Sequence, residues 1–356
     1  MMVPVSIESR NGKFNVAPPE TEIEATNFAL RLTRQGGNYT KDLLDEMFSQ
    51  KGDYQLAATY CEPDDGKSDT LQILTHGIGF DRHYWDFPYN NHNYSYVEQA
   101  VDQHGYSTLA WDRLGIGMSS RGDDPVNEIQ VHLEIAALHA LTVRAKDGTL
   151  SACLGKKFKH LQHAGHSFGS VITYGFSNMW PDMTEAIALT GFSQVGNFIA
   201  YFGLGGNFAP VKENKGLADK YPVGFLAPKS SIGVHINFFA PDDFDPEILP
   251  VAAMTGQPVS IGELLTVAAP TVVENQYPGR VLIITGEHDI PFCGGDCKAT
   301  DVINGSAPDL LQASKPMFPK ASSFKTVMVD GAGHGLNYQY THVSTYKSIL
   351  DFFGSS

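Results

Sequence analysis

Short apolar runs that end in glycine-rich corners alternate with helical patterns along most of this sequence. The runs cover residues 71–75, 107–111, 159–164, 185–190, 280–285 and 324–329. Parallel strands need long crossover connections, which are usually helices. The alternation therefore predicts the α/β fold class, with a mostly parallel sheet covered by helices on both faces.

Composition excludes several classes of protein. The 356-residue chain carries 25 Lys and Arg against 39 Asp and Glu, a net charge of −14. A nucleic-acid partner needs a basic surface, so we expect none. No apolar run is long enough for a membrane span, and neither repeats nor biased tracts stand out. Hydrophobic residues make up 42 % of the chain, which is enough for a sizeable core.

Apolar periodicity predicts further elements around these strands. Helices are expected near residues 23–32, 43–48, 125–145 and 343–353, and a strand over residues 54–61. Residues 1–60 are interpreted as an N-terminal lead-in. Residues 195–270 interrupt the alternation and are interpreted as an insertion. The predicted organisation is a core of residues 1–194 and 271–356 with this insertion between them.

Gly165-His-Ser167-Phe-Gly169 follows a predicted strand and precedes a helical pattern. A sharp turn from strand to helix crowds the backbone, so glycines flank the serine and its hydroxyl is exposed above the sheet. The motif alone is short, but its position at the carboxyl end of a strand is where ligands bind in parallel sheets. Ser167 is therefore the predicted nucleophile.

A serine hydroxyl needs a general base, and the chain has 13 histidines. His334 follows the last predicted strand between glycines, which lets its ring approach the serine. His166 neighbours the serine, but adjacent side chains in a sharp turn point apart. His76 is expected to brace its own loop. His160 and His163 lie within a strand and are expected to be core histidines. We predict His334 as the base.

The base needs a carboxylate to hold its tautomer. Asp289 ends the predicted strand at 280–285, and Glu287 is the alternative. The resulting order of serine, aspartate and histidine differs from those of chymotrypsin and subtilisin. For the oxyanion hole we expect the backbone N–H of Phe168 and that of Ile78, with Gly79 the next candidate.

The four cysteines do not fix the redox compartment. Cys293 and Cys297 flank a Gly-Gly-Asp turn that could close a small disulfide loop, and this is favoured over a two-cysteine metal site. Cys61 and Cys153 are isolated, and their pairing is left open. The N-terminus lacks a basic segment followed by an apolar one. Either the protein is intracellular, or a signal peptide is absent from this sequence; the secreted alternative is preferred.

Five motifs together resemble the α/β-hydrolase superfamily. They are His76-Gly-Ile-Gly-Phe80, Asp112-Arg-Leu-Gly-Ile-Gly-Met-Ser119, Gly-His-Ser-Phe-Gly, Gly-Glu-His-Asp289 and Gly-Ala-Gly-His334. The 76–85 stretch, the following Pro-Tyr-Asn-Asn and the Phe-Cys-Gly-Gly-Asp-Cys loop resemble a group of fungal, often secreted α/β-hydrolases.

The resemblance implies an α/β-hydrolase fold in which residues 195–270 form a cap over the active site. Aromatic residues of this cap would line the substrate pocket, or would form the cap's own core. The candidates are Phe198, Tyr201, Phe202, Phe208, Phe238 and Phe239, with Gly79 at the edge of the oxyanion loop.

The leading hypothesis is a serine hydrolase that cleaves an ester or lactone of an apolar small molecule without metal or organic cofactor. A serine at the elbow argues against the epoxide hydrolases and haloalkane dehalogenases of the superfamily, which have aspartate there. Alternatives are a lyase, C–C hydrolase or cyclase with the same triad, and a non-catalytic binding protein. The substrate and the oligomeric state are left open.

Overall fold

The computed structural model describes residues 1–151 and 155–355, so Cys153 lies outside the described residues. The strands are β1 (Met2–Phe14), β2 (Leu44–Cys61), β3 (Thr70–Thr75), β4 (Asp86–Phe87), β5 (Tyr94–Ser95), β6 (Ser107–Trp111), β7 (His160–His166), β8 (Ala186–Thr190), β9 (Phe208–Pro210), β10 (Phe225–Pro228), β11 (Val259–Ser260), β12 (Arg280–Gly286) and β13 (Ser323–Val329). The α-helices are α1 (Glu22–Leu32), α2 (Tyr39–Leu43), α3 (Tyr96–Glu98), α4 (Val131–Asp147), α5 (Phe168–Met179), α6 (Ile199–Gly205), α7 (Ser231–Phe238), α8 (Ile248–Thr255), α9 (Ile261–Thr266), α10 (Ile290–Cys293) and α11 (His342–Gly354).

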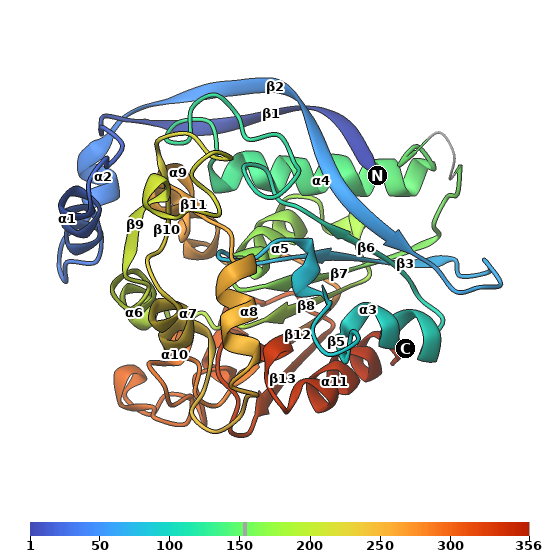
Figure 1. The fold of residues 1–356 in the computed structure, drawn as a ribbon. Helices are drawn as coiled ribbons and strands as arrows, with labels where there is room; N and C mark the ends of the chain where they lie inside the picture. The colour runs from blue at the N-terminus through green and yellow to red at the C-terminus, as the bar shows by residue number, and fades with distance from the viewer. Residues whose placement is uncertain (152–154, 356) are drawn as a thin grey trace.

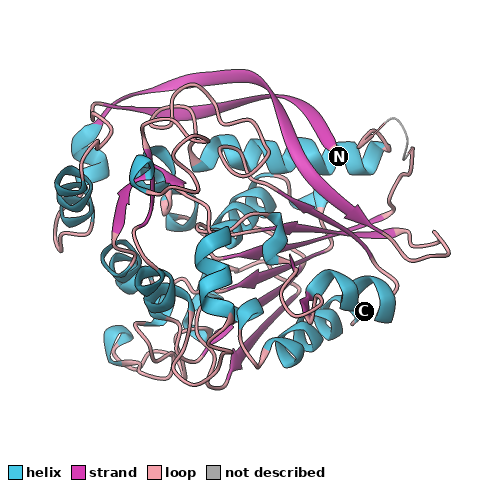
Figure 2. Ribbon diagram, in the orientation of Figure 1, coloured by secondary structure: helices cyan, strands magenta, loops and turns pink. Residues whose placement is uncertain are grey.

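An eight-stranded sheet forms the centre of the molecule, in the order β1-β2-β6-β3-β7-β8-β12-β13. Six of these strands, β6, β3, β7, β8, β12 and β13, run parallel to one another. Strands β1 and β2 are antiparallel additions at one edge. These six are the strands that the apolar runs predict. Helices α4 and α5 cover one face of the sheet, and α3 and α11 cover the other (Figures 1 and 2). The predicted α/β fold class is therefore confirmed.

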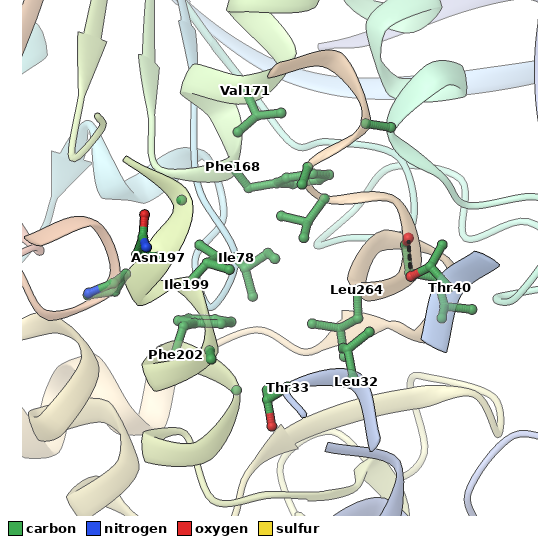
Figure 3. A pocket seen from close by; sticks show the side chains of 18 of the residues that line it. Leu32, Thr33, Thr40, Ile78, Phe168, Val171, Asn197, Ile199, Phe202 and Leu264 are labelled. Carbon is green, nitrogen blue, oxygen red and sulfur yellow. Dashed lines mark hydrogen bonds between the residues drawn. The ribbon is translucent and has the colours of Figure 1, made fainter. Parts of the chain in front are cut away.

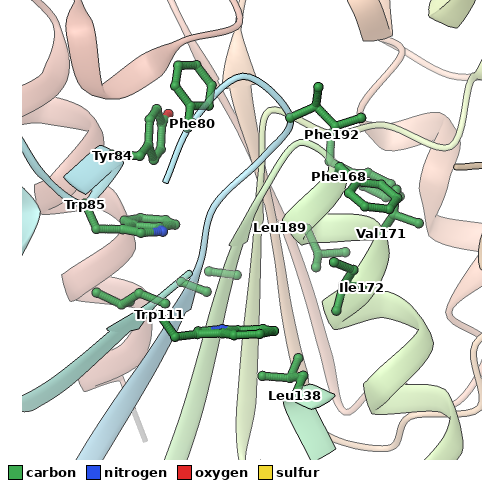
Figure 4. Packing of buried hydrophobic residues seen from close by; sticks show 14 of the residues in the cluster. Phe80, Tyr84, Trp85, Trp111, Leu138, Phe168, Val171, Ile172, Leu189 and Phe192 are labelled. Carbon is green, nitrogen blue, oxygen red and sulfur yellow. The ribbon is translucent and has the colours of Figure 1, made fainter. Parts of the chain in front are cut away.

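The core packs helix α5 against the sheet. Val171 and Ile172 of α5 lie near Leu189 of β8, and all three are buried (Figure 4). On the other side of this view, the fully buried Trp111 ends β6 and donates its indole N–H to Thr75 at 2.9 Å. Burial of the apolar surface is what stabilises this arrangement, since each large side chain contributes roughly 1.5–3 kcal/mol.

Strand β7 is unusually polar for the middle of a sheet, and the structure gives its buried side chains partners. On one face, Gln162 accepts from Gln72 at 3.1 Å and donates to the Phe353 carbonyl at 3.2 Å. On the other, His163 lies 3.0 Å from the hydroxyl of Thr142. Burial lowers the pKa of His163 to about 3, so the ring is neutral. Hydrogen bonding removes most of the free-energy cost of burying these polar groups. His163 is therefore a core histidine, as the sequence predicts.

The N-terminal region differs from the expectation. The helix predicted over residues 43–48 is wrong, because that stretch begins the long strand β2, paired with β1 over the whole length of β1. Leu44 and Met47 are exposed, so the apolar face that suggested a helix is not buried. Strand β1 was not predicted, although its alternating Val3, Val5 and Ile7 are buried in the period-two pattern of a strand.

Helix α4 begins later than predicted. Pro125 does not open it, because the Asp124 carboxylate accepts from the N–H groups of Val126 and Asn127 and folds this stretch into a turn. Gln130 is extended and its side chain bonds both backbone groups of Gly12 in β1. The helix starts only after this contact. The predicted helices near residues 23–32 and 343–353 correspond to α1 and α11 and are confirmed.

Residues 195–270 contain α6 to α9 and a separate three-stranded sheet in the order β11-β10-β9. Helix α1 packs against β9 and α6, so part of the N-terminal lead-in lies beside this segment (Figure 1). Over the described ranges, none of the helices combines the length and apolar character needed to span a bilayer.

Candidate active site

The turn between β7 and α5 holds Ser167 in a strained backbone conformation. Its φ of 55° lies in the region that residues other than glycine rarely adopt. A Cβ added at Gly165 would lie 2.3 Å from the Gly169 carbonyl oxygen, and one at Gly169 would lie 2.3 Å from that of Thr75. Both positions therefore require glycine, and this is the physical reason for the Gly-x-Ser-x-Gly pattern.

Three strand ends bring Ser167, Asp289 and His334 together. His334 Nε2 lies 2.8 Å from Ser167 Oγ, and His334 Nδ1 lies 2.7 Å from Asp289 Oδ2. Asp289 and His334 are almost fully buried, and Ser167 is 8 % exposed. The carboxylate is fixed further by the hydroxyl of Thr285 at 2.5 Å and by the N–H of Phe292 at 2.8 Å. This series of hydrogen bonds orients the imidazole toward the serine hydroxyl.

Glu287, the alternative acid, lies elsewhere. Its carboxylate pairs with Lys298 at 2.6 Å and accepts from the Gly331 N–H, and the Lys298 contact lowers the pKa of Glu287. His76 braces its own loop as expected, because its ring lies 2.8 Å from the Gly77 carbonyl and accepts from the Arg113 N–H. Burial lowers the pKa of His76 to about 3.

His166 is nearer to the site than expected. Its ring centroid lies 4.9 Å from that of His334 and stacks on Tyr84 at 4.2 Å. Nδ1 lies 3.1 Å from the Thr190 hydroxyl. Burial, and then the neighbouring His334, hold the pKa of His166 well below its usual value. A neutral His166 places no second positive charge beside His334.

The His76–Gly79 loop lies against the serine turn. A Cβ at Gly77 would lie 2.8 Å from Ser167 Cβ, so this loop approaches the nucleophile closely. Across the described ranges, no hydrogen bond occupies the N–H of Ile78 or of Phe168. The Arg113 guanidinium lies 4.8 Å from the centroid of the Phe168 ring and donates to the Gly77 carbonyl at 3.4 Å. One buried cation thus touches both segments expected to form the oxyanion hole.

A disulfide joins Cys293 and Cys297, with their Cα atoms 4.8 Å apart. It spans the end of α10, the short helix whose N-cap is Asp289. The N–H of Cys297 also donates to the Glu287 carbonyl at 2.8 Å. The loop therefore ties α10 back to the end of β12. The remaining described cysteine, Cys61, is free.

A cavity of about 560 Å³ opens onto Ser167. This volume suits a small organic ligand, since such pockets range from roughly 300 to 1,000 Å³. Figure 3 shows how its walls combine distant parts of the chain. They include Ile78, Phe168, Val171, Asn197, Ile199, Phe202, Leu264 and Phe292, and the N-terminal Leu32, Thr33, Arg34, Asn38 and Thr40.

Only one of the six expected aromatic wall residues, Phe202, lines this cavity. The prediction for Tyr201 needs a correction, because this residue is 49 % exposed and does not line the cavity. Helix α6 places adjacent residues on different faces. Phe198 packs over Gly294. The ring is so close that a Cβ atom added to Gly294 would lie 2.6 Å from it.

The other expected wall residues serve mainly as packing. Phe208 packs on Phe202, with ring centroids 5.4 Å apart. Phe239 packs on Phe244 at 4.7 Å. Phe238 lies roughly parallel to the His334 ring at 5.9 Å, and with Gly79 it lines a second cavity of about 250 Å³.

The N-terminal contribution to the cavity was missed by sequence reasoning. Residues 32–40 lie more than 120 positions before Ser167, and no local pattern connects them to it. Thr285 and Phe292 were also missed. Their spacing from Asp289 could have indicated them, because Thr285 lies four residues before it and Phe292 three residues after it. Asp289 follows a strand and caps a helix, so its carboxylate can accept hydrogen bonds from both positions.

Comparison with known proteins identifies the family. The sequence pattern described as "Alpha/beta hydrolase family" matches residues 72–343, so the chain belongs to the alpha/beta hydrolase family. The search of curated proteins found no match.

Solved structures share the fold at low sequence identity. A thermophilic esterase from Thermogutta terrifontis is 13 % identical, with a TM-score of 0.55 over 85 % of this chain and 94 % of that one. An enol-lactonase from Burkholderia xenovorans LB400 is 14 % identical, with a TM-score of 0.55 over 85 % of this chain and 97 % of that one. A bromoperoxidase from Bacillus anthracis is 16 % identical, with a TM-score of 0.52 over 86 % of this chain and 97 % of that one. At these identities the likeness concerns the fold alone.

Proposed function

We propose that this protein is a serine hydrolase that cleaves a carboxylic ester or a lactone of an apolar small molecule. The observation that carries the proposal is the series of hydrogen bonds from Ser167, which lines the cavity, through His334 to Asp289. The mostly aliphatic and aromatic lining favours an apolar substrate.

In the proposed reaction, Ser167 Oγ attacks the substrate carbonyl while His334 Nε2 accepts its proton. Asp289 holds the N–H at Nδ1 and stabilises the imidazolium that forms. His334 then donates the proton to the leaving alcohol, which leaves an acyl group on Ser167. Water, deprotonated by His334, releases the acid and restores the serine.

The negative charge that develops on the carbonyl oxygen needs donors that are already in place. We assign this role to the N–H groups of Phe168 and Ile78. Both residues line the cavity beside Ser167, and neither N–H is used elsewhere in the described chain. The contact of Arg113 with both segments supports their fixed spacing.

We assign residues 195–270 to a cap on a core of residues 1–194 and 271–356. The contacts of α1 with α6 and β9 add the N-terminal segment to this cap. A cap of this kind excludes water from the reaction. The Cys293–Cys297 disulfide supports a secreted protein, because such bonds persist in oxidising compartments.

The nucleophile is tested with Ser167→Ala and a panel of p-nitrophenyl esters and lactones. The variant should fold normally by circular dichroism and lose turnover by about 10⁶-fold, as removal of a triad serine does. Near wild-type kcat in the variant would mean that the nucleophile is elsewhere.

The acid is tested with a matched pair of variants. Asp289→Asn should lower kcat by about 10⁴-fold, because the amide favours the wrong imidazole tautomer. Glu287→Gln should have little effect, since this carboxylate pairs with Lys298 at the surface. The reverse result would assign the acid to Glu287.

A further inference from the structure

Among the residues that line the cavity above Ser167, Arg34 is the one with a charged side chain. Every other residue of its lining is neutral, and none is acidic. This contrasts with the chain as a whole, in which acidic residues outnumber basic ones by 39 to 25. A substrate in this cavity therefore meets a local charge opposite in sign to that of the protein.

Arg34 lies at the exposed rim, contributed by the turn between α1 and α2. The turn is held by its backbone, because the Gly37 N–H donates to the Arg34 carbonyl at 3.0 Å. Gly36 adopts a φ of 74°, which few other residues tolerate. Within the described residues, the Arg34 guanidinium has neither an ion pair nor a hydrogen bond.

Two lysines near α1 face acidic residues. Lys229 pairs with Glu22, and Lys212 lies 3.8 Å from Glu20. The fork of N–H donors on Arg34 has no partner within the described residues and is available to a ligand. A planar guanidinium matches a carboxylate through two parallel hydrogen bonds.

We propose that Arg34 is a specificity determinant that binds a carboxylate on the substrate, remote from the bond that is cleaved. The substrate class is then an ester or lactone with an apolar body and a carboxylate at its far end. The reacting carbonyl lies at Ser167, the apolar body contacts residues such as Phe202 and Leu264, and the carboxylate lies at the rim. This inference rests on the proposed hydrolase function and adds the substrate's charge to it.

The test compares mono-p-nitrophenyl esters of linear dicarboxylic acids with p-nitrophenyl esters of fatty acids of the same chain length. The measured quantity is the ratio of kcat/KM for the charged ester to that for the neutral ester. Arg34→Gln should lower this ratio about fivefold at the preferred chain length, mainly through KM, because an exposed pair of charges contributes modestly. The effect should shrink at 0.5 M salt, where exposed charges are screened.

Arg31→Gln is the matched control. Arg31 lies in the last turn of α1, is exposed and does not line the cavity, so its removal changes the net charge equally. It should leave the ratio unchanged, whereas Arg34→Glu should favour the neutral ester more strongly than Arg34→Gln does. Equal effects of the Arg31 and Arg34 variants, or no effect of either Arg34 variant, would overturn the proposal.

Binding separates this proposal from the hydrolase proposal. The same esters can be titrated calorimetrically into Ser167→Ala with and without Arg34→Gln. If the enzyme hydrolyses neutral esters but Arg34 affects neither rate nor binding, the carboxylate site fails alone. If no ester is hydrolysed by the native protein, the hydrolase proposal fails, and weaker binding of the charged ester to the Gln variant would still support the carboxylate site.

Discussion

A buried cluster of charges makes a quantitative prediction about stability. The Arg113 guanidinium donates to Glu134 and to Glu263, and all three side chains are fully buried. One cation faces two carboxyl groups. Burial raises the pKa of Glu134 well above its usual value, and the charge of Glu263 raises it further, against the opposing effect of Arg113. The folded protein therefore keeps a proton on Glu134 at pH values where an unfolded glutamic acid has lost it.

The perturbation is Glu134→Gln, which keeps the shape and removes the titration. An unfolded glutamic acid titrates near pH ~4.3, so above that pH unfolding of the native protein releases the proton held by Glu134. The native state thus loses stability as pH rises, by about 1.4 kcal/mol per pH unit, until the pKa of the folded state is reached. The glutamine variant lacks this loss.

The assay is urea unfolding of both proteins at intervals from pH 5 to pH 7. The free energy of unfolding of the variant minus that of the native protein should rise with pH in this window, by at most about 1.4 kcal/mol per pH unit. The exposed Glu247→Gln should give a flat difference. A flat difference for Glu134→Gln as well would refute the assignment of the proton.

Two further predictions concern the cavity and the disulfide. Phe202→Ala should lower kcat/KM for long-chain esters roughly tenfold or more, because a buried phenyl group contributes about 1.5–3 kcal/mol; Tyr201→Ala, which alters an exposed ring on the same helix, should change it little. Ellman titration of the denatured, unreduced protein should find no more than two thiols among the four cysteines, because Cys293 and Cys297 are joined. Four reactive thiols would contradict the bond.

Local patterns predicted the sheet and the polar corners at its edge. The apolar runs of β3, β6, β8 and β12 are visible in the sequence because a buried parallel strand needs continuous apolar residues. The more polar β7 and the edge strand β13 are marked by the glycine-rich corners that follow them. The carboxyl ends of parallel strands meet at one edge, so Ser167, Asp289 and His334 could be placed near one another by counting strand ends. Their hydrogen-bond distances are decided only by the tertiary structure.

The error at residues 43–48 shows where local pattern fails. Leu44 and Met47 have helical spacing, but pairing with β1 decides the conformation of this stretch. Their partners, Phe14 and Gly12, lie 30 and 35 residues earlier. Backbone hydrogen bonds between distant segments outweigh the weak preference of a short segment.

The sequence by itself determined the fold class, the order of the strands along the chain, and the glycines that the serine turn requires. Only the tertiary structure decided which side chains surround the site. It placed Arg34 at the cavity rim, turned Tyr201 outward and Phe202 inward, and enclosed Arg113 between two carboxyl groups. Periodicity reports which face of one element is buried, whereas a cavity and a buried charge cluster depend on the packing of several elements that no local pattern relates to one another.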